Sequence, residues 1–205
     1  MSEVRRLGLY GGTFDPIHVG HLVAAAEVHH ALALGRVLFL PAGRPPHKRG
    51  QAVTPAAERA RMIELAIAGR PQFALSMLDL DGAAPSYTAD LLARARDTWD
   101  ADLYFIMGED SLRDFPGWRE PARVAALARL AVVTRPNVEV DVAAVERAVP
   151  ALAGRVHCVP IPEIDVASHD IRARVTAGRP IAYQVPLAVE AYIRERGLYR
   201  VTGDE

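Results

Sequence analysis

The stretch that most constrains the fold of this chain reads Gly11-Gly12-Thr13-Phe14-Asp15-Pro16-Ile17-His18-Val19-Gly20-His21. It follows an apolar run at 6–10 that predicts a first β-strand, and a helical pattern begins near Val19. Glycines let a backbone approach a polyanion closely, and the free N–H groups of a helix N-terminus point at bound phosphate. His18 and His21 are three residues apart, which places both imidazoles on one face of the first helical turn. The stretch therefore predicts a phosphate-binding turn between a strand and a helix.

Apolar runs alternate with helical patterns along the remainder of the chain. Strands are expected at 6–10, 37–41, 73–78, 103–107, 130–134 and 156–159. Helices are expected at 19–34, 55–68, 88–98, 121–128, 142–149, 169–177 and 185–196. This alternation predicts an α/β fold with a doubly wound, mainly parallel sheet, in a single domain over 1–205 whose C-terminal helical part is 165–205. The first glycine-rich turn and a loop at Gly108-Glu109-Asp110 should both open beyond the carboxyl ends of the strands, where such sheets bind ligands.

Length, charge and composition narrow the class of protein further. Half of the 205 residues are hydrophobic, so the chain can bury a sizeable core. A net charge of −1 disfavours nucleic acid or an anionic membrane surface as a partner. The single cysteine, the absence of a leader pattern and the absence of a membrane-length apolar run predict a cytoplasmic protein, with homo-oligomerisation left open. Lys48 is the only lysine among the 24 basic residues, which singles it out as a candidate functional cation.

Several of these features also have simpler interpretations when each is taken alone. The pair Gly11-Gly12 fits any tight strand-to-helix turn. His18 and His21 are spaced like the histidines of a helical zinc site, but such a site needs three or four ligands and no third lies nearby in sequence. The residues therefore predict no metal site built by the protein itself. The segment 86–88 alone fits a helix cap, and Trp118 alone fits a core aromatic.

The full order Gly-Gly-Thr-Phe-Asp-Pro-x-His-x-Gly-His resembles the signature of the His-x-Gly-His nucleotidyltransferases, and among them the bacterial nicotinate-nucleotide adenylyltransferases. Further segments that resemble this family are spread over nearly the whole chain, at 39–48, 86–91, 105–112, 115–118, 135–136 and 192–199. The resemblance implies a Rossmann-like nucleotidyltransferase fold.

The resemblance also implies a reaction: adenylyl transfer from ATP to nicotinate mononucleotide in NAD biosynthesis, giving deamido-NAD and pyrophosphate. Because the attacking phosphate oxygen is already anionic, catalysis would rest on alignment and charge neutralisation. Catalytic contacts are implied for His18, His21, Lys48 and Arg172. ATP-binding residues are implied at Gly11, Gly12, Thr13, Phe14, Gly108, Asp110, Ser168 and Ile171, and nicotinate-nucleotide-binding residues at Ser86, Tyr87, Thr88 and Trp118. Mg²⁺ is expected as a cofactor carried mainly by ATP.

One segment departs from the family's usual Ile-Ser-Ser-Thr-x-x-Arg pattern. Residues 166–172 read Val-Ala-Ser-His-Asp-Ile-Arg, so Ala167 and His169 stand where the family carries hydroxyl side chains. Backbone N–H groups at this helix start would still serve phosphate. Three alternatives stay open: an adenylyltransferase that uses nicotinamide mononucleotide or both nucleotides, one for another phosphorylated acceptor, and a non-catalytic nucleotide-binding sensor. Class I aminoacyl-tRNA synthetases share the His-x-Gly-His signature, but the chain is too short for one and lacks the charge for tRNA.

Overall fold

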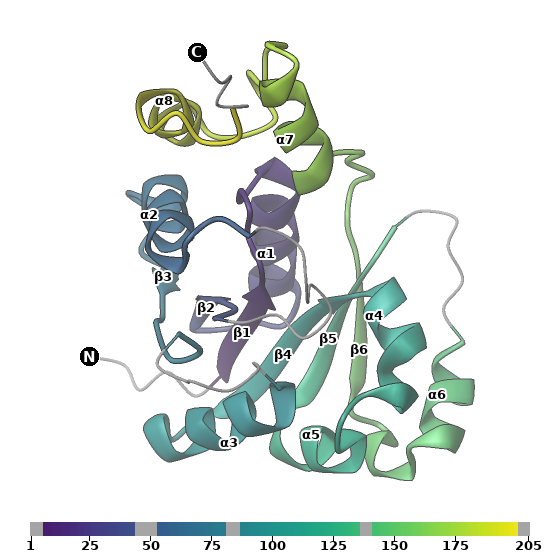
Figure 1. Ribbon diagram of the computed structural model, residues 1–205. Coiled ribbons are helices and arrows are strands. Elements are labelled where there is room, and N and C mark those ends of the chain that lie inside the picture. Colours follow the sequence, from purple (N-terminus) through teal and green to yellow (C-terminus); the bar gives the residue numbers. More distant parts are fainter. Residues whose placement is uncertain (1–5, 44–52, 81–86, 136–140, 201–205) are drawn as a thin grey trace.

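A six-stranded β-sheet, parallel throughout, forms the centre of the protein (Figure 1). The structure is a computed structural model that describes residues 6–43, 53–80, 87–135 and 141–200. The strands lie in the order β3-β2-β1-β4-β5-β6. Their bounds are β1 Arg6–Gly12, β2 Arg36–Pro41, β3 Phe73–Leu75, β4 Asp102–Gly108, β5 Arg129–Thr134 and β6 Val156–Pro160. The predicted doubly wound parallel sheet is confirmed.

Helices cover both faces of the sheet (Figure 1). One face is covered by α1 (Val19–Ala31) and α2 (Ala56–Ile67). Beyond them, α7 (Ser168–Thr176) and α8 (Leu187–Glu195) extend the same core, and α8 packs on α2 (Figure 1). The other face is covered by α3 (Thr88–Thr98), α4 (Glu109–Asp114), α5 (Pro121–Leu127) and α6 (Val142–Ala148), with short 3₁₀ turns at Phe115–Gly117 and Pro150–Leu152. Within the described ranges, no helix has both the length and the apolar character needed to cross a membrane.

Burial on both faces explains the almost entirely apolar sequence of β4. Leu103, Phe105 and Met107 belong to the core beneath α3 and α5, whereas Tyr104 and Ile106 belong to the core beneath α1 and α2. All five side chains are at most 5% exposed. Burial of one such side chain contributes roughly 1.5–3 kcal/mol, and parallel strands covered on both faces are typically this apolar. The two cores together fix β4 beside β1.

The order of the strands reverses where β1 and β4 lie side by side. β1 pairs with β2 on one edge and with β4 on the other. The helices that follow β1 and β2 cover one face, and those around β4 and β5 cover the opposite face. Doubly wound sheets bind ligands at such a switch point, outside the carboxyl ends of the strands. Gly12 ends β1 and Gly108 ends β4, so both predicted glycine positions lie at this edge.

Three predictions differ from the structure by more than one or two residues at an element end. The loop predicted at Gly108-Glu109-Asp110 is wrong after Gly108, because α4 begins at Glu109. Its six residues make less than two turns, too few to show helical periodicity, although acidic residues in a first turn are favourable there. The helix predicted over 19–34 ends at Ala31, and Ala33 takes a left-handed φ of +47°. β3 is only three residues long, shorter than the run predicted at 73–78.

Candidate active site

The segment between β1 and α1, residues 13–18, forms a turn that we call the β1–α1 loop. Phe14 anchors it: the ring is 2% exposed and packs edge-on against Tyr10 and Phe39, with centroids 5.5 and 5.7 Å away. The Phe14 backbone is left-handed, at φ +51°. A Cβ atom on Gly12 would lie 2.9 Å from the Phe14 ring, so this position requires glycine. The buried phenylalanine therefore anchors the β1–α1 loop on the core beside the end of β1.

His18 and His21 are stacked at the start of α1. Their ring centroids are 3.7 Å apart with a tilt of 33°. His18 is the N-cap residue, and its backbone N–H donates to Nδ1 of His21 at 3.3 Å. Because that Nδ1 accepts, the neutral His21 ring carries its proton on Nε2. A Cβ atom on Gly20 would lie 3.1 Å from His18 Nδ1, which explains the glycine between the two histidines.

Burial keeps both imidazoles neutral at pH 7. It lowers the pKa of His18 from 6.5 to about 4. The pKa of His21 falls well below 6.5, first through burial and second through the charge that His18 would carry. The sequence left the charge of these rings open, and the structure makes them neutral donors in the free protein. The Nδ1 of His18 is buried against the first turn of α1, close to the backbone of Gly20.

The first turn of α1 is partly occupied by the protein's own backbone. The Val19 N–H donates to the carbonyl of Gln184 at 2.9 Å, and the His18 N–H is held by His21. Within the described part of the chain, this leaves the Gly20 N–H for a ligand, together with the histidine side chains. The prediction of freely available N–H groups at this helix start is therefore only partly fulfilled.

The start of α7 docks on the β1–α1 loop. Arg172 Nη1 donates to the carbonyl of Asp15 at 2.7 Å, and Ser168 Oγ donates to the carbonyl of Pro16 at 2.9 Å. His169 is exposed, and its ring lies 3.3 Å from the adjacent carboxylate of Asp170. Ser168 and Arg172, both predicted site residues, thus contact the β1–α1 loop directly. Their hydrogen bonds go to two loop carbonyls that lie 152 and 157 residues away in sequence.

Ile171, by contrast, is not brought to the site. Its side chain is fully buried in the core beneath α7, and its backbone N–H donates to the carbonyl of Ala167 at 3.1 Å. The residue has no polar group left for a ligand. The helical position that the family pattern assigned to ATP is a packing position in this structure.

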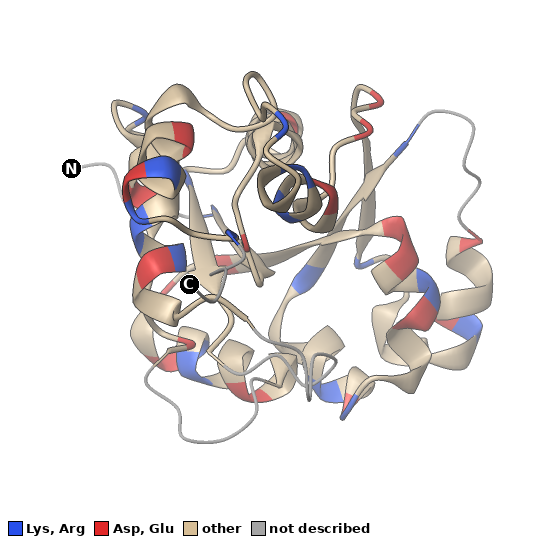
Figure 2. Ribbon diagram, turned by 45° about the horizontal axis from the view of Figure 1, so that its top comes forward, with Lys and Arg blue, Asp and Glu red and all other residues tan. Residues whose placement is uncertain are grey.

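Charged residues of both signs are interspersed along the helices, and α4 shows how they are used near the site (Figure 2). Glu109 is 3% exposed and accepts from Arg135 Nε at 2.8 Å and from the Arg135 backbone N–H at 3.2 Å. The exposed Asp110 accepts from Arg113 and from Arg135. The ion pair fixes the start of α4 against the end of β5 and gives Glu109 a structural role.

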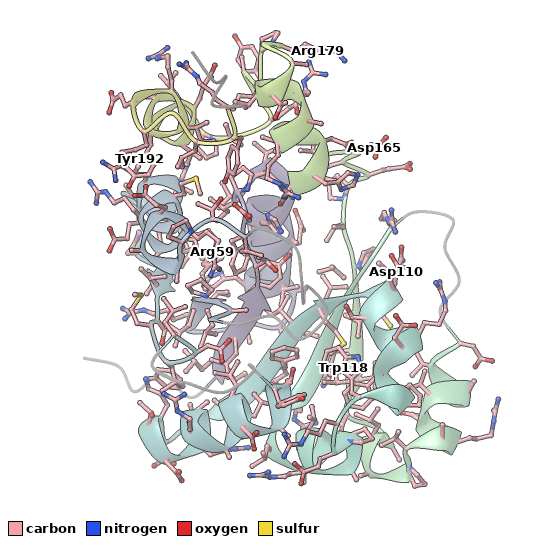
Figure 3. The ribbon with its side chains drawn as sticks, viewed as in Figure 1. Arg59, Asp110, Trp118, Asp165, Arg179 and Tyr192 are labelled. Carbon is pink, nitrogen blue, oxygen red and sulfur yellow. The ribbon has the colours of Figure 1, made fainter. Side chains whose placement is uncertain are left out.

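The residues predicted for the second nucleotide lie across the switch point, on the α3–α5 side. α3 begins at Thr88 with Tyr87 as its N-cap, as predicted, and the Arg119 guanidinium lies 4.4 Å from the centre of the Tyr87 ring. Half-buried Trp118 packs between Phe105 and Phe115, with centroids 6.3 and 5.3 Å away (Figure 3). Phe105 also lies against Gly11, so one aromatic ring separates the glycine-rich strand end from Trp118. Lys48 and Ser86, both predicted site residues, lie outside the described residues.

A buried polar network beneath the loop was missed by the sequence analysis. Arg59 is 1% exposed and donates to the carbonyls of Thr13, Ala42 and Thr54 at 2.7–2.9 Å. Asp15 is 2% exposed and accepts from the Tyr199 hydroxyl at 2.8 Å. The available signal was an arginine on the apolar face of a predicted helix, since Arg59 shares the buried stripe of α2 with Met62 and Ile63.

The chain matches known proteins over most of its length. The model of the cytidylyltransferase-like family matches residues 9–174. This chain belongs to that family. A probable nicotinate-nucleotide adenylyltransferase of Thermomicrobium roseum is 54% identical over 196 residues, which cover 95% of this chain and 92% of the relative. One of Roseiflexus sp. is 47% identical over 194 residues, covering 95% and 98%. The resemblance to the nicotinate-nucleotide adenylyltransferases is therefore confirmed.

Solved structures share the fold of this chain. The Plasmodium falciparum nicotinic acid mononucleotide adenylyltransferase complexed with NaAD superposes with a TM-score of 0.77 at 18% identity, covering 95% of this chain and 97% of that one. A Vibrio parahaemolyticus structure described as a putative nicotinate-nucleotide adenylyltransferase gives a TM-score of 0.68 at 19% identity, covering 97% of each chain. The predicted Rossmann-like nucleotidyltransferase fold is confirmed.

The described residues of this cytidylyltransferase-like chain do not by themselves form a metal site. Among them, no group of three or more His, Cys, Asp or Glu side chains lies close enough together to hold a metal ion. His18 and His21 stack against each other, and the Nδ1 atom of His21 is occupied by a backbone donor. Such an arrangement suits donation to an anion better than coordination of a cation.

Proposed function

We propose that this protein transfers the adenylyl group of ATP to nicotinate mononucleotide, forming deamido-NAD and releasing pyrophosphate. The observation that carries the proposal is the stacked pair of neutral imidazoles at the start of α1, next to the carboxyl end of β1. The relatives named probable nicotinate-nucleotide adenylyltransferase, which match nearly the full chain, support the choice of substrates.

The reaction needs alignment and charge stabilisation rather than a base. A 5′-phosphate oxygen of nicotinate mononucleotide forms a bond to the α-phosphorus of ATP, and the bond from that phosphorus to the oxygen bridging to the β-phosphate breaks. The electron pair leaves with pyrophosphate. Since the attacking oxygen is anionic at neutral pH, the protein has to hold two polyanions in line and stabilise the charge that moves to the leaving group.

The histidines and Arg172 are suited to these tasks. His21 carries its proton on Nε2 and would donate it as a hydrogen bond to the α-phosphate. The Nη1 atom of Arg172 donates to the carbonyl of Asp15, and the other guanidinium nitrogens would bind the departing β- and γ-phosphates. Loss of one such donor commonly slows a reaction about 100-fold. Lys48 stays a prediction for the same phosphates.

The adenosine half of ATP would lie over the ends of β1 and β4. Gly11, Gly12, Thr13 and Phe14 would line the phosphates through the backbone of the strand end and loop, and Gly108 and Asp110 would meet the ribose. A carboxylate accepts hydrogen bonds from ribose hydroxyls in many dinucleotide sites. Ser168 holds the loop through Pro16, so its contribution to ATP binding would be indirect. Ile171 would contribute packing only.

Nicotinate would be recognised at the start of α3. The N–H groups of Tyr87 and Thr88 lie at a helix N-terminus, where a carboxylate is favoured by the helix dipole. Trp118, half-buried beside Phe105, would present a ring face to the pyridine. Ser86 stays a prediction. A binding site built around a carboxylate predicts preference for the acid over the amide.

Nucleotidyltransferases of this kind generally use a divalent metal ion. We propose Mg²⁺, which retains much of its hydration and would be carried mainly by the phosphates of ATP. When bound, it would neutralise charge on the triphosphate.

Product analysis tests the proposal. The protein, ATP, Mg²⁺ and nicotinate mononucleotide are incubated together, and deamido-NAD and pyrophosphate are quantified by chromatography and a coupled assay. The proposal predicts equal amounts of both products and none when the acceptor is omitted. ATP binding without pyrophosphate release would contradict it and favour a nucleotide sensor.

A further inference from the structure

The C-terminal segment reaches the catalytic loop through Tyr199, a residue that no part of the reaction scheme above uses. The Tyr199 hydroxyl donates to Asp15 Oδ1 at 2.8 Å and lies 3.9 Å from the sulfur of Met62. Tyr199 follows α8 in a left-handed backbone conformation, with φ +64°. Burial, together with the neighbouring Asp15 carboxylate, strongly raises the pKa of Tyr199, so the phenol stays protonated and remains a donor.

Asp15 receives contacts from three distant parts of the chain. Its Oδ1 accepts from Tyr199, and its Oδ2 accepts from the Thr54 N–H at 3.2 Å. Its backbone carbonyl accepts from Arg172 Nη1 at 2.7 Å. The carboxylate and the carbonyl belong to one residue, so the contacts that fix the carboxylate also fix the carbonyl on which Arg172 rests.

Arg59 provides the charge that makes this buried carboxylate tolerable. It lies between α2 and α1 (Figure 3), where burial lowers its pKa and the nearby Asp15 carboxylate opposes that shift. It donates hydrogen bonds to the backbone carbonyls of Thr13, Ala42 and Thr54, and the N–H of Thr54 in turn donates to Asp15. A buried cation and a buried carboxylate whose hydrogen bonds are satisfied form a rigid support.

We propose that Tyr199 is a positioning residue for adenylyl transfer: through Asp15, it fixes the carbonyl that orients Arg172 toward the departing phosphates. The proposal rests on the proposed function and adds to it a role for the C-terminal segment. Tyr199 would not touch substrate. Its effect should therefore appear in the rate of the chemical step, because small displacements of a catalytic cation are costly there.

Tyr192 provides a matched control in the same segment. Its hydroxyl donates to Glu58 Oε2 at 2.7 Å, so it makes a tyrosine–carboxylate bond like that from Tyr199 to Asp15 at 2.8 Å. Tyr192 joins α8 to α2 (Figure 3), and the contacts found for it do not include the β1–α1 loop. Loss of either hydroxyl removes one tyrosine–carboxylate bond, but only one of the two bonds leads to Arg172.

The test compares Tyr199→Phe and Tyr192→Phe in the full chain. Both keep the aromatic ring, but Tyr199→Phe leaves the buried Oδ1 of Asp15 without its donor and should lower the melting temperature more than Tyr192→Phe, whose partner Glu58 lies nearer the surface. We expect Tyr199→Phe to lower kcat roughly 10-fold, with the KM for nicotinate mononucleotide unchanged within about 2-fold. Tyr192→Phe should leave both constants within about 2-fold of wild type. Equal kcat values for the two variants would overturn the proposal.

A double-mutant cycle with Arg172→Lys tests the route of the effect. If Tyr199 acts through Arg172, Tyr199→Phe should cost little further rate once the guanidinium is gone, whereas independent effects multiply. Multiplying effects would overturn the proposed route.

Asp15→Asn offers a second variant. It should also lower kcat, and its effect on kcat should not multiply with that of Tyr199→Phe. Full activity of Asp15→Asn would overturn the role of Asp15. Absence of turnover in the wild-type protein would contradict the proposed function itself, and this proposal with it.

Discussion

The imidazole rings of His18 and His21 stack at the start of α1 with their centroids 3.7 Å apart, and the backbone N–H of the first donates to Nδ1 of the second. This arrangement has two consequences. A proton on His21 would be repelled by a proton on His18, which adds to burial in favouring the neutral pair. The tautomer of His21 is also fixed, with its N–H on Nε2.

The neutral pair predicts a pH-dependent stability. The pKa of His18 is about 4 in the folded protein and about 6.5 when the chain unfolds, so between these values the unfolded state binds more protons. The stabilisation is present above pH 6.5 and is lost as the pH falls toward 4, by on the order of 3 kcal/mol for this residue. Chemical denaturation at pH 7, 6 and 5 measures it. His18→Gln should flatten the dependence, while the control His30→Gln, at an exposed position, should not; equal slopes in all three proteins would contradict the account.

The tautomer of His21 predicts which substitution retains activity. Gln places an amide N–H near the position of Nε2, whereas Asn places its amide near Nδ1, where the His18 N–H needs an acceptor. His21→Ala and His21→Asn should lower kcat about 100-fold, and His21→Gln should retain several-fold more activity than either. Steady-state kinetics at saturating ATP gives the comparison. If Asn restored more activity than Gln, the assigned tautomer would be wrong.

The Glu109–Arg135 pair predicts a stability effect close to the site. Arg135→Ala leaves a nearly buried carboxylate with one backbone donor, and should lower the free energy of unfolding by about 1–3 kcal/mol. Arg113→Ala is the control, since it removes an exposed pair with Asp110 and should cost under about 1 kcal/mol. Urea denaturation of the two variants distinguishes them. A loss no larger for Arg135→Ala than for the control would count against a supporting role for Glu109.

The two tryptophans of the chain allow a direct test of nicotinate stacking. Trp118→Phe reduces the ring face offered to the pyridine and should raise the KM for nicotinate mononucleotide roughly 3- to 10-fold, with little change in the KM for ATP. Trp99→Phe is the matched control, because Trp99 follows α3 at the far end from Tyr87 and packs against the same core. A similar rise in both variants would show that Trp118 acts through the core alone.

Most of the fold could be predicted from local sequence. The apolar run of β4 and the start of α3 at Thr88 are local signals, and both strand ends at the switch point carry glycine where predicted. α4 could not be predicted because six residues show no periodicity. The end of α1 before Ala33 could not be predicted either, because Ala33 adopts a left-handed backbone although alanine ordinarily extends a helix.

The buried polar network that supports the site could not be predicted from local sequence. Arg59, Asp15 and Tyr199 are brought together across 184 residues, and apart from the Tyr199–Asp15 bond their hydrogen bonds are to backbone carbonyls and N–H groups that any sequence would supply. The family pattern identified Arg172 as a charged anchor, but only the structure shows that one of its nitrogens rests on Asp15. The same pattern assigned Ile171 to ATP, whereas the helix points that residue into the core.

The most direct test of the central claim is the initial rate of pyrophosphate release from ATP and Mg²⁺ with three acceptors measured side by side: nicotinate mononucleotide, nicotinamide mononucleotide and 4′-phosphopantetheine. The account predicts turnover with the nicotinate nucleotide, a kcat/KM for the amide lower by roughly 10- to 100-fold because a charge-assisted contact is lost, and no turnover with phosphopantetheine. Equal rates with acid and amide would contradict the carboxylate site at Tyr87 and Thr88. Turnover with phosphopantetheine alone, or with none of the three, would contradict the proposed function.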